Sequence, residues 1–185
     1  MVKVVELYGG AITTIIPEGF LDVSLLREVP DTQEVYVNSR EDTEVFNDGL
    51  GKNESVIVDL LESVDADSEE EAFRIHMAEL SDLNNSEQWA KIKDTKPTAN
   101  SQCCLLVESA KKWGKSELNE TVAICMALIR LDEFQTDVVI TINIPLGKEN
   151  FTQASISAHH NITAAYQLLL EMVKQFKIVD ESLFA

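Results

Sequence analysis

The first third of the chain contains short apolar runs that are separated by turn-forming residues. These runs are rich in β-branched side chains, and Gly, Pro, Asn or Asp stands between them. They occupy residues 4–7, 11–16, 34–38 and 55–61. Short bounded runs of this kind are typical of buried strands. Gly9-Gly10 separates the first two runs, which predicts a hairpin. The polar stretches between the later runs leave room for single helical turns at 22–26 and 42–48.

Two amphipathic helices are predicted further along. Ser68 stands three residues before Glu71, the spacing of a capping box, and marks the start of the first helix. This helix should run to about Leu83 and bury a stripe formed by Phe73, Met77 and Leu80. Asn161 is predicted to cap the second helix, which ends near Phe176. Its apolar face comprises Ala165, Leu168, Leu169, Met172 and Phe176.

The remaining apolar patterns predict a sheet. Strands are expected at 102–112, 121–131 and 137–145, with a turn at Trp113-Gly114 between the first two. Five to seven strands joined by short turns, together with two long helices, favour an α+β fold. We expect one domain over residues 1–185, built as an α/β/α sandwich with a mostly antiparallel central sheet flanked by helices.

Length and cysteine content are compatible with an intracellular protein. A chain of 185 residues can bury a full core without disulfide or metal staples. No apolar run approaches the roughly 20 residues that span a bilayer, and the N-terminus lacks a signal-peptide pattern. Cys103 and Cys104 are neighbours that should point to opposite faces of a strand. Together with Cys125 they are expected to be ordinary buried thiols.

The charge of the chain is strongly acidic and unevenly distributed. The formal net charge is −17, and twelve acidic residues face a single base, Lys52, between positions 41 and 71. Nucleic acid and anionic membranes are therefore disfavoured as partners. A basic protein partner is favoured, because opposite charge speeds encounter. The alternative is a solvated acidic surface that serves solubility alone.

No motif predicts catalysis, a cofactor or a metal site. Gly114-Lys115-Ser116 resembles the end of a phosphate-binding loop, but Ser109 stands where that loop needs its first glycine. His76, His159 and His160 have no ligand partners at metal-site spacing. No serine stands in the Gly-x-Ser-x-Gly pattern that marks the nucleophile elbow of hydrolases. We therefore expect a protein that binds rather than an enzyme.

Asp59 is the most unusual acid, because it interrupts the apolar strand at 56–61. A buried unpaired charge is costly, so Asp59 should face solvent at an edge or pair with a base such as Arg27 or Arg130. Glu62 lies three residues further on. In a regular strand such positions face opposite sides. The two acids can share one interface only if the strand ends, bulges or turns near Leu61.

Several polar words of this chain resemble a known family. The words are Leu7-Tyr8-Gly9-Gly10-Ala11, Pro17-Glu18-Gly19-Phe20, Leu26-Arg27-Glu28-Val29-Pro30-Asp31-Thr32-Gln33-Glu34-Val35, Val58-Asp59-Leu60-Leu61-Glu62, Ala127-Leu128-Ile129-Arg130-Leu131, and Thr136-Asp137 through Asn143-Ile144-Pro145. They resemble the Ran guanine nucleotide release factors, the Mog-type nuclear import proteins that bind the small GTPase Ran. The likeness covers nearly the whole chain in order and is weakest at 81–102.

This resemblance implies both a fold and a function. The family has a PsbP-like fold, with a central antiparallel sheet between helices. The implied function is to bind Ran, promote guanine nucleotide release and support nuclear protein import, in nucleus and cytoplasm, as a monomer without chemistry of its own. Whether a Ran exchange factor joins as a second partner stays open. The alternative function is that of a PsbP-like ligand or assembly module whose acidic surface only solubilises it.

The resemblance also implies site residues. The acids of the Asp-Leu-Leu-Glu word are associated with Ran binding in the family, and they correspond here to Asp59 and Glu62. Arg27, Asp31, Gln33 and Glu34 lie in the longest matching word and are further candidates for the interface. For two of these a local role is equally open: Asp31 could anchor the turn after Pro30, and Arg27 could pair internally.

Overall fold

The computed structural model describes residues 1–84, 86, 89–111, 119–147 and 152–185. Within them, the larger of two sheets has seven strands, all antiparallel to their neighbours. Its spatial order is β3 (Phe20–Asp22), β4 (Gln33–Asn38), β5 (Ser55–Glu62), β9 (Thr136–Gly147), β8 (Asn119–Leu131), β7 (Ser101–Lys111) and β6 (Trp89–Thr95). The predicted turn at Trp113-Gly114 lies outside the described residues.

The smaller sheet consists of β1 (Val2–Leu7), β2 (Ile12–Pro17) and β10 (Lys177–Ile178). Three α-helices complete the fold, namely α1 (Glu69–Leu83), α2 (Gln153–Ala158) and α3 (His160–Gln175). Short 3-10 turns lie at η1 (Tyr8–Gly10), η2 (Val23–Leu25), η3 (Asp132–Phe134) and η4 (Glu181–Phe184). The predicted hairpin of the first two strands is confirmed, but it does not join the large sheet.

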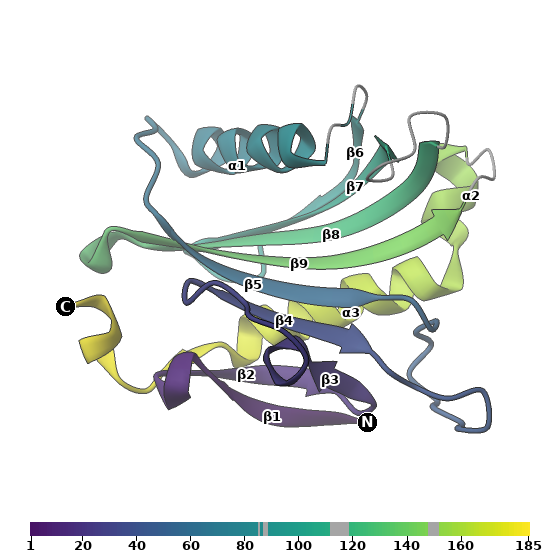
Figure 1. Ribbon diagram of the computed structural model, residues 1–185. Helices are drawn as coiled ribbons and strands as arrows, with labels where there is room; N and C mark the ends of the chain where they lie inside the picture. The colour runs from purple at the N-terminus through teal and green to yellow at the C-terminus, as the bar shows by residue number, and fades with distance from the viewer. Residues whose placement is uncertain (85, 87–88, 112–118, 148–151) are drawn as a thin grey trace.

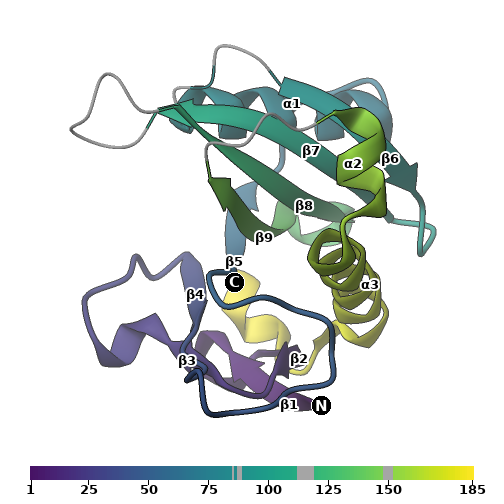
Figure 2. The same ribbon diagram turned by 90° about the vertical axis from the view of Figure 1, so that its right-hand side faces the viewer.

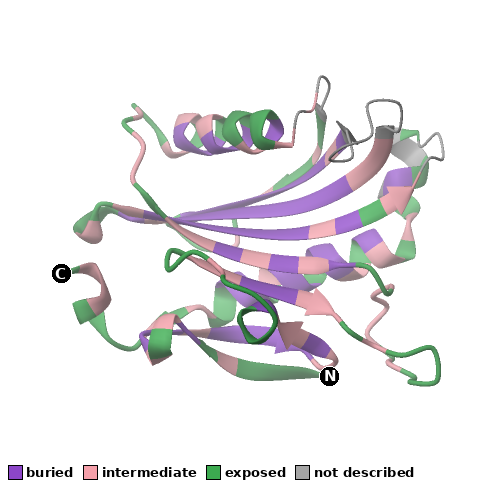
Figure 3. Cartoon of the chain, viewed as in Figure 1, coloured by how far each residue is buried: buried purple, intermediate pink, exposed green. Residues whose placement is uncertain are grey.

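Helices cover both faces of the large sheet (Figure 1). Alternation along β8 explains the two layers. Cys125 and Ala127 face the core cluster that contains Leu169 of α3. Met126 and Leu128 face the opposite cluster, which contains Phe73 of α1. Burial is therefore concentrated in the middle strands and on the inner sides of the helices (Figure 3). The predicted α+β arrangement is confirmed.

Helix α3 joins the two sheets. It packs against β8 and β9 of the large sheet and against β2 of the small one, which forms a separate layer in Figure 2. The Thr14 hydroxyl on β2 donates a hydrogen bond to the Met172 carbonyl of α3 over 2.9 Å. Leu7 and Ile12 of the hairpin are buried in the same cluster as Val58 of β5. The small sheet thus extends the core of the large one.

Some local predictions were right and others wrong. Ser68 caps α1 as expected, although Glu71 accepts from the backbone N–H of Asp67 instead of completing the box. Asn161 is not a cap: α3 begins at His160 with His159 in the N-cap position, so Asn161 lies inside its first turn, and Thr152 caps the separate short helix α2. Strands β3, β6 and β10 were not predicted.

The helical turn expected at 42–48 is also absent, and Arg40 accounts for the conformation of this loop. Its guanidinium donates to both carboxylate oxygens of Asp48 and to the carbonyl of Glu18. It also lies over the ring of Phe46, 4.0 Å from the centroid. Side-chain contacts to one buried cation therefore replace helical hydrogen bonds in this segment.

The three described cysteines are free and buried. Cys103 and Cys104 lie on β7 and point to opposite faces, as their separate core clusters show. Burial raises the pKa of the Cys103 thiol to about 12 and also raises the pKa values of Cys104 and Cys125. Their predicted role as ordinary core residues is confirmed.

A buried carboxylate, Asp137 on β9, connects α1 to the segment that directly follows β5. It contacts His76 Nε2 at 2.8 Å and Arg130 Nε at 3.2 Å. It also accepts from the Ser63 hydroxyl and the Val64 N–H, both at 3.2 Å. Burial opposes ionisation, but the hydrogen bonds from His76 and Val64 and the charge of Arg130 together lower the pKa of Asp137. The carboxylate is therefore a charged centre of the fold.

We expect Asp137→Ala to destabilise the protein by about 3–5 kcal/mol, because it leaves Arg130 and His76 without their buried partner. The matched control is Asp132→Ala, since Asp132 also approaches Arg130 but is 87% exposed. That change should cost about 1 kcal/mol or less. Urea denaturation at pH 7 measures both. Equal losses in the two variants would contradict the assignment of Asp137 as the anchor.

Candidate functional site

Asp59 lies on β5 between β4 and β9, in the interior of the large sheet. Its cross-strand neighbours are Gln33 on β4 and Val139 on β9. The Gln33 side-chain amide donates a 2.7 Å hydrogen bond to Asp59 Oδ1. Val139 belongs to the core cluster under α1, so Asp59 projects from that same face of the sheet. Strand pairing therefore creates the Gln33–Asp59 contact.

The electrostatic environment of Asp59 is unfavourable for its charge. The residue is only partly exposed, and burial raises its pKa, partly offset by the hydrogen bond from Gln33. Among the described residues, no basic side chain forms an ion pair with Asp59 or with Glu34. The carboxylate is thus held by a neutral amide and lacks a counter-charge.

Glu34 occupies the opposite face of β4. Its Oε1 accepts a 2.6 Å hydrogen bond from the backbone N–H of Tyr8. Burial raises the pKa of Glu34, and the bond from Tyr8 opposes this rise. Two half-buried carboxylates, on the two faces of neighbouring strands, therefore lie near this end of the sheet.

Tyr8 is a residue of this region that the sequence did not predict. Its hydroxyl donates to the carbonyl of Val58 over 2.8 Å and approaches that of Thr32 at 3.3 Å. Burial raises the pKa of Tyr8, and the charges of Asp59 and Glu34 raise it further. Its backbone is left-handed, with φ of 52°, and Gly9 and Gly10 that follow also have positive φ. The only sequence signal was the tyrosine directly before a Gly-Gly turn.

Glu62 is the last residue of β5 and is exposed. Its partner on β9 is Thr136, and the β5–β9 ladder runs to this point without a bulge. Asp59 and Glu62 therefore project from opposite faces of the sheet. The two acids were expected to share an interface only if the strand ended, bulged or turned near Leu61. The structure meets the first of these conditions, because β5 ends at Glu62. Leu61 between them is 36% exposed.

Arg27 and Asp31 lie in the exposed segment that leads into β4. Asp31 sits in a turn closed by the hydrogen bond from the Gln33 N–H to the Pro30 carbonyl. The pairing of Asp59 with Arg27 or Arg130 was predicted wrongly. Arg130 is occupied by Asp137, at 3.2 Å, and the partner of Asp59 is Gln33. The expected position at a sheet edge was also wrong, since β5 is flanked on both sides.

We call Gln33, Glu34, Asp59 and Glu62 the β5 carboxylate site. Of the six predicted residues, the structure brings Gln33 and Asp59 into direct contact and places Glu34 and Glu62 on the opposite face of the same two strands. Within the described part of the chain, no group of three or more potential ligands could hold a metal ion. No described helix has the length and apolar character needed to cross a bilayer.

The chain is similar to several known proteins. Residues 5–145 match the family model described as Ran-interacting Mog1 protein. The nuclear import protein MOG1 of Saccharomyces cerevisiae is 56% identical over 185 residues, covering 99% of this chain and 85% of that protein. The human Ran guanine nucleotide release factor is 32% identical over 165 residues, covering 80% and 82% of the two chains.

The solved structures agree with the sequence comparisons. The crystal structure of the S. cerevisiae Ran-binding protein Mog1p matches with a TM-score of 0.88 and 53% identity, and covers 100% of this chain and 99% of that one. The structure of a point mutant of protein Mog1 gives a TM-score of 0.89 at 52% identity over the full length of both chains. Sequence and fold together show that this chain belongs to the family of Ran-interacting Mog1 proteins.

Proposed function

We propose that this protein binds Ran through the β5 carboxylate site and, by doing so, promotes guanine nucleotide release in nuclear protein import. The family is one of Ran-interacting proteins, which makes Ran the partner. Relatives are named a nuclear import protein and a Ran guanine nucleotide release factor. The protein is accordingly a regulator of a GTPase and carries out no chemistry of its own.

The main support for this site is the charge of Asp59, which has no basic partner among the described residues. A carboxylate that is partly removed from water and has no cation beside it costs folding free energy. A lysine or arginine from a partner would supply the missing counter-charge without needing to displace a salt bridge. Leu61, which is 36% exposed, lies on the same face of β5 as Asp59, and Glu62 ends the strand on the opposite face. A basic side chain flanked by apolar contact is therefore the group that this surface fits best.

Binding of this kind leads to nucleotide release by thermodynamic coupling. A protein that binds the nucleotide-free GTPase more tightly than the loaded one weakens nucleotide binding by the same factor. Carboxylates can do so by competing with phosphate for basic groups of the nucleotide site. We further propose that the protein acts as a monomer in nucleus and cytoplasm. A ternary complex with a Ran exchange factor would use surface outside this site.

The alternative is an assembly module whose acidic surface only aids solubility. A solubilising carboxylate is best placed in full contact with water, as for the exposed acids at 41–44. Asp59 is not placed in this way, since burial raises its pKa. The cost of holding this charge in the sheet favours a binding role.

The first prediction concerns stability. Because the Asp59 pKa is raised in the folded state, the folded protein binds that proton more tightly than the unfolded chain, and stability falls as pH rises through the raised value. Asp59→Asn should therefore increase the free energy of unfolding at pH 7. The gain should vanish below about pH 4, where the carboxyl is protonated in both states.

Urea denaturation at the two pH values measures this difference. Glu62→Gln is the matched control, since Glu62 is exposed at the strand end and should leave the unfolding free energy unchanged. If Asp59→Asn lowers stability at pH 7, Asp59 is a structural acid, and its role as a site held for a partner is lost.

The second prediction concerns Ran binding. Asp59→Lys should weaken the complex by about 2–5 kcal/mol, because it removes one partner of a desolvated charge pair and adds repulsion. Glu62→Lys should cost less and act mainly on the association rate, as expected for a rim charge. Binding kinetics with immobilised Ran and nucleotide release from loaded Ran report the two effects.

Asp82→Lys and Glu44→Lys make the same change in net charge at exposed positions away from β5. Thermal melts should be similar for Glu62→Lys and both controls. Equal weakening by all four variants would show that bulk charge alone governs binding and would remove the proposed site.

A further inference from the structure

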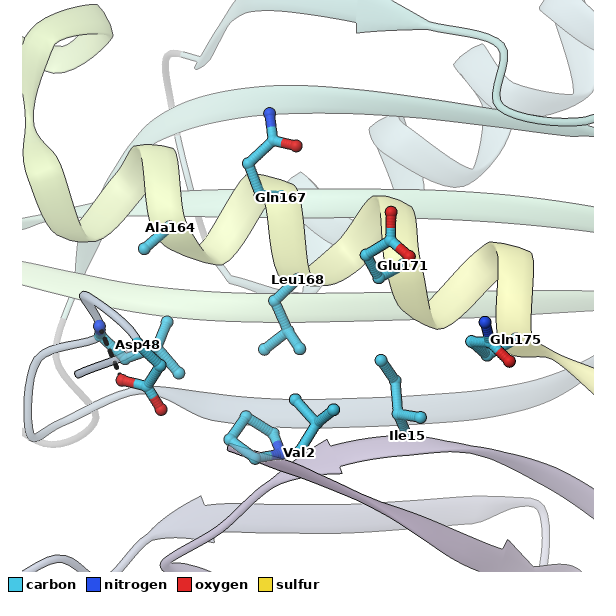
Figure 4. Close-up of a pocket in the computed structure, with 10 residues that line it drawn as sticks. Val2, Ile15, Asp48, Ala164, Gln167, Leu168, Glu171 and Gln175 are labelled. Carbon is cyan, nitrogen blue, oxygen red and sulfur yellow. Dashed lines mark hydrogen bonds between the residues drawn. The ribbon is translucent and has the colours of Figure 1, made fainter. Parts of the chain in front are cut away.

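A groove of about 520 Å³ lies between α3 and the β1–β2 hairpin. The apolar part of its lining is formed by Val2, Ile15, Pro17, Leu50, Ala164 and Leu168. Figure 4 shows Leu168 reaching from α3 towards Val2 and Ile15 of the hairpin. Volumes of 300–1,000 Å³ with mostly apolar lining are typical of ligand sites.

The two walls of the groove, the hairpin and α3, are fixed relative to each other. Thr14 on β2 is bonded to the Met172 carbonyl of α3, which holds hairpin and helix at a set separation. At one end, Asp48 accepts from Arg40 and from the backbone N–H of Leu50. The Arg40 side chain is only 4% exposed, and its charge is compensated by Asp48 inside the protein. Because the walls of the groove are already ordered, binding does not cost the conformational entropy of ordering them.

One wall carries a polar stripe. Gln167, Glu171 and Gln175 follow one another at intervals of four residues along α3 and border the groove. Eight residues of helix span about 12 Å, the length of about four residues of extended chain. Glutamine side chains both donate and accept hydrogen bonds. The stripe therefore suits a backbone that runs alongside it.

The charge of the lining is acidic. Among the described residues that line the groove are the carboxylates of Asp48 and Glu171 and no basic side chain. Asp48 is neutralised by Arg40, whereas Glu171 pairs with Lys174 at 2.8 Å, and both of these side chains are 50% exposed. Such surface pairs contribute little, so another cation can replace Lys174. Val4, 73% exposed, continues the apolar surface along β1.

We propose that this groove binds a short extended segment of a basic partner protein. Two or three apolar side chains of the segment fill the space over Val2, Ile15 and Leu168, and a lysine or arginine pairs with Glu171. The groove begins at Val2, whereas the β5 carboxylate site lies beside Tyr8, at the other end of the hairpin. Ile15, which also lines the groove, pairs with Val4, and four residues of strand separate Val4 from Tyr8 by about 13 Å. The groove is therefore a second surface, independent of the Ran site.

Selection from a random linear heptapeptide library displayed on phage tests the proposal, with the full chain immobilised. Enriched peptides should combine apolar residues with lysine or arginine and lack acids. Synthetic copies are then measured by fluorescence anisotropy. Val2→Lys and Glu171→Lys should each weaken their binding by about tenfold or more. Both positions are substantially exposed, so melts should stay normal.

Two variants serve as matched controls. Leu83→Lys places a cation on an exposed apolar residue of α1, on the other face of the large sheet, and Glu62→Lys reverses a charge at the β5 carboxylate site. Both should leave peptide binding unchanged, and Glu171→Lys should leave Ran binding unchanged. The proposal is overturned if nothing is enriched over the naive library, if enriched peptides are acidic, or if either groove variant binds them as well as the unmodified chain.

Discussion

The arrangement of this protein depends on one buried carboxylate. Asp137 receives hydrogen bonds from α1, from β8 and from the segment directly after β5, so three parts of the chain meet at its two oxygens. Arg130 completes the connection by donating to the Val64 carbonyl as well. The other end of α1 is held by the Ser81 hydroxyl, which donates a hydrogen bond to the buried Glu108 of β7. The Asp137 centre sets where β5 stops, and Glu62 is the residue at which it stops.

Charge is used in two different ways on the two neighbouring strands. Asp137 on β9 is buried but surrounded by donors, and its pKa is lowered. Asp59 on β5 is half-buried and has one amide donor, and its pKa is raised. By linkage, ionisation of the first carboxylate favours the folded state, whereas ionisation of the second is predicted to oppose it. A surface that weakens the fold is retained when it serves another purpose, which agrees with a partner-binding role for β5.

The features predicted correctly from sequence are mostly local. The Ser68 cap and the stripe of Phe73 and Met77 depend on residues a few positions apart, and the apolar runs of β5 and β9 are equally self-contained. The Gln33–Asp59 contact joins residues 26 apart, and the Tyr8–Val58 contact joins residues 50 apart. Both require the register of strand pairing, which the pattern of side chains does not specify. The prediction for Asn161 failed because α3 begins one residue earlier, at His160, after an N-cap residue, His159, whose side chain makes no capping hydrogen bond.

The three buried cysteines have a consequence for how opening of the molecule can be followed. Thiols react as thiolates, and burial keeps the pKa values of all three far above neutral pH. They lie on the adjacent strands β7 and β8, inside both core layers. A thiol reagent can therefore reach them only when the sheet itself separates from its helices. The rate at which the thiols are modified therefore reports cooperative unfolding of the molecule and does not report motion of its loops.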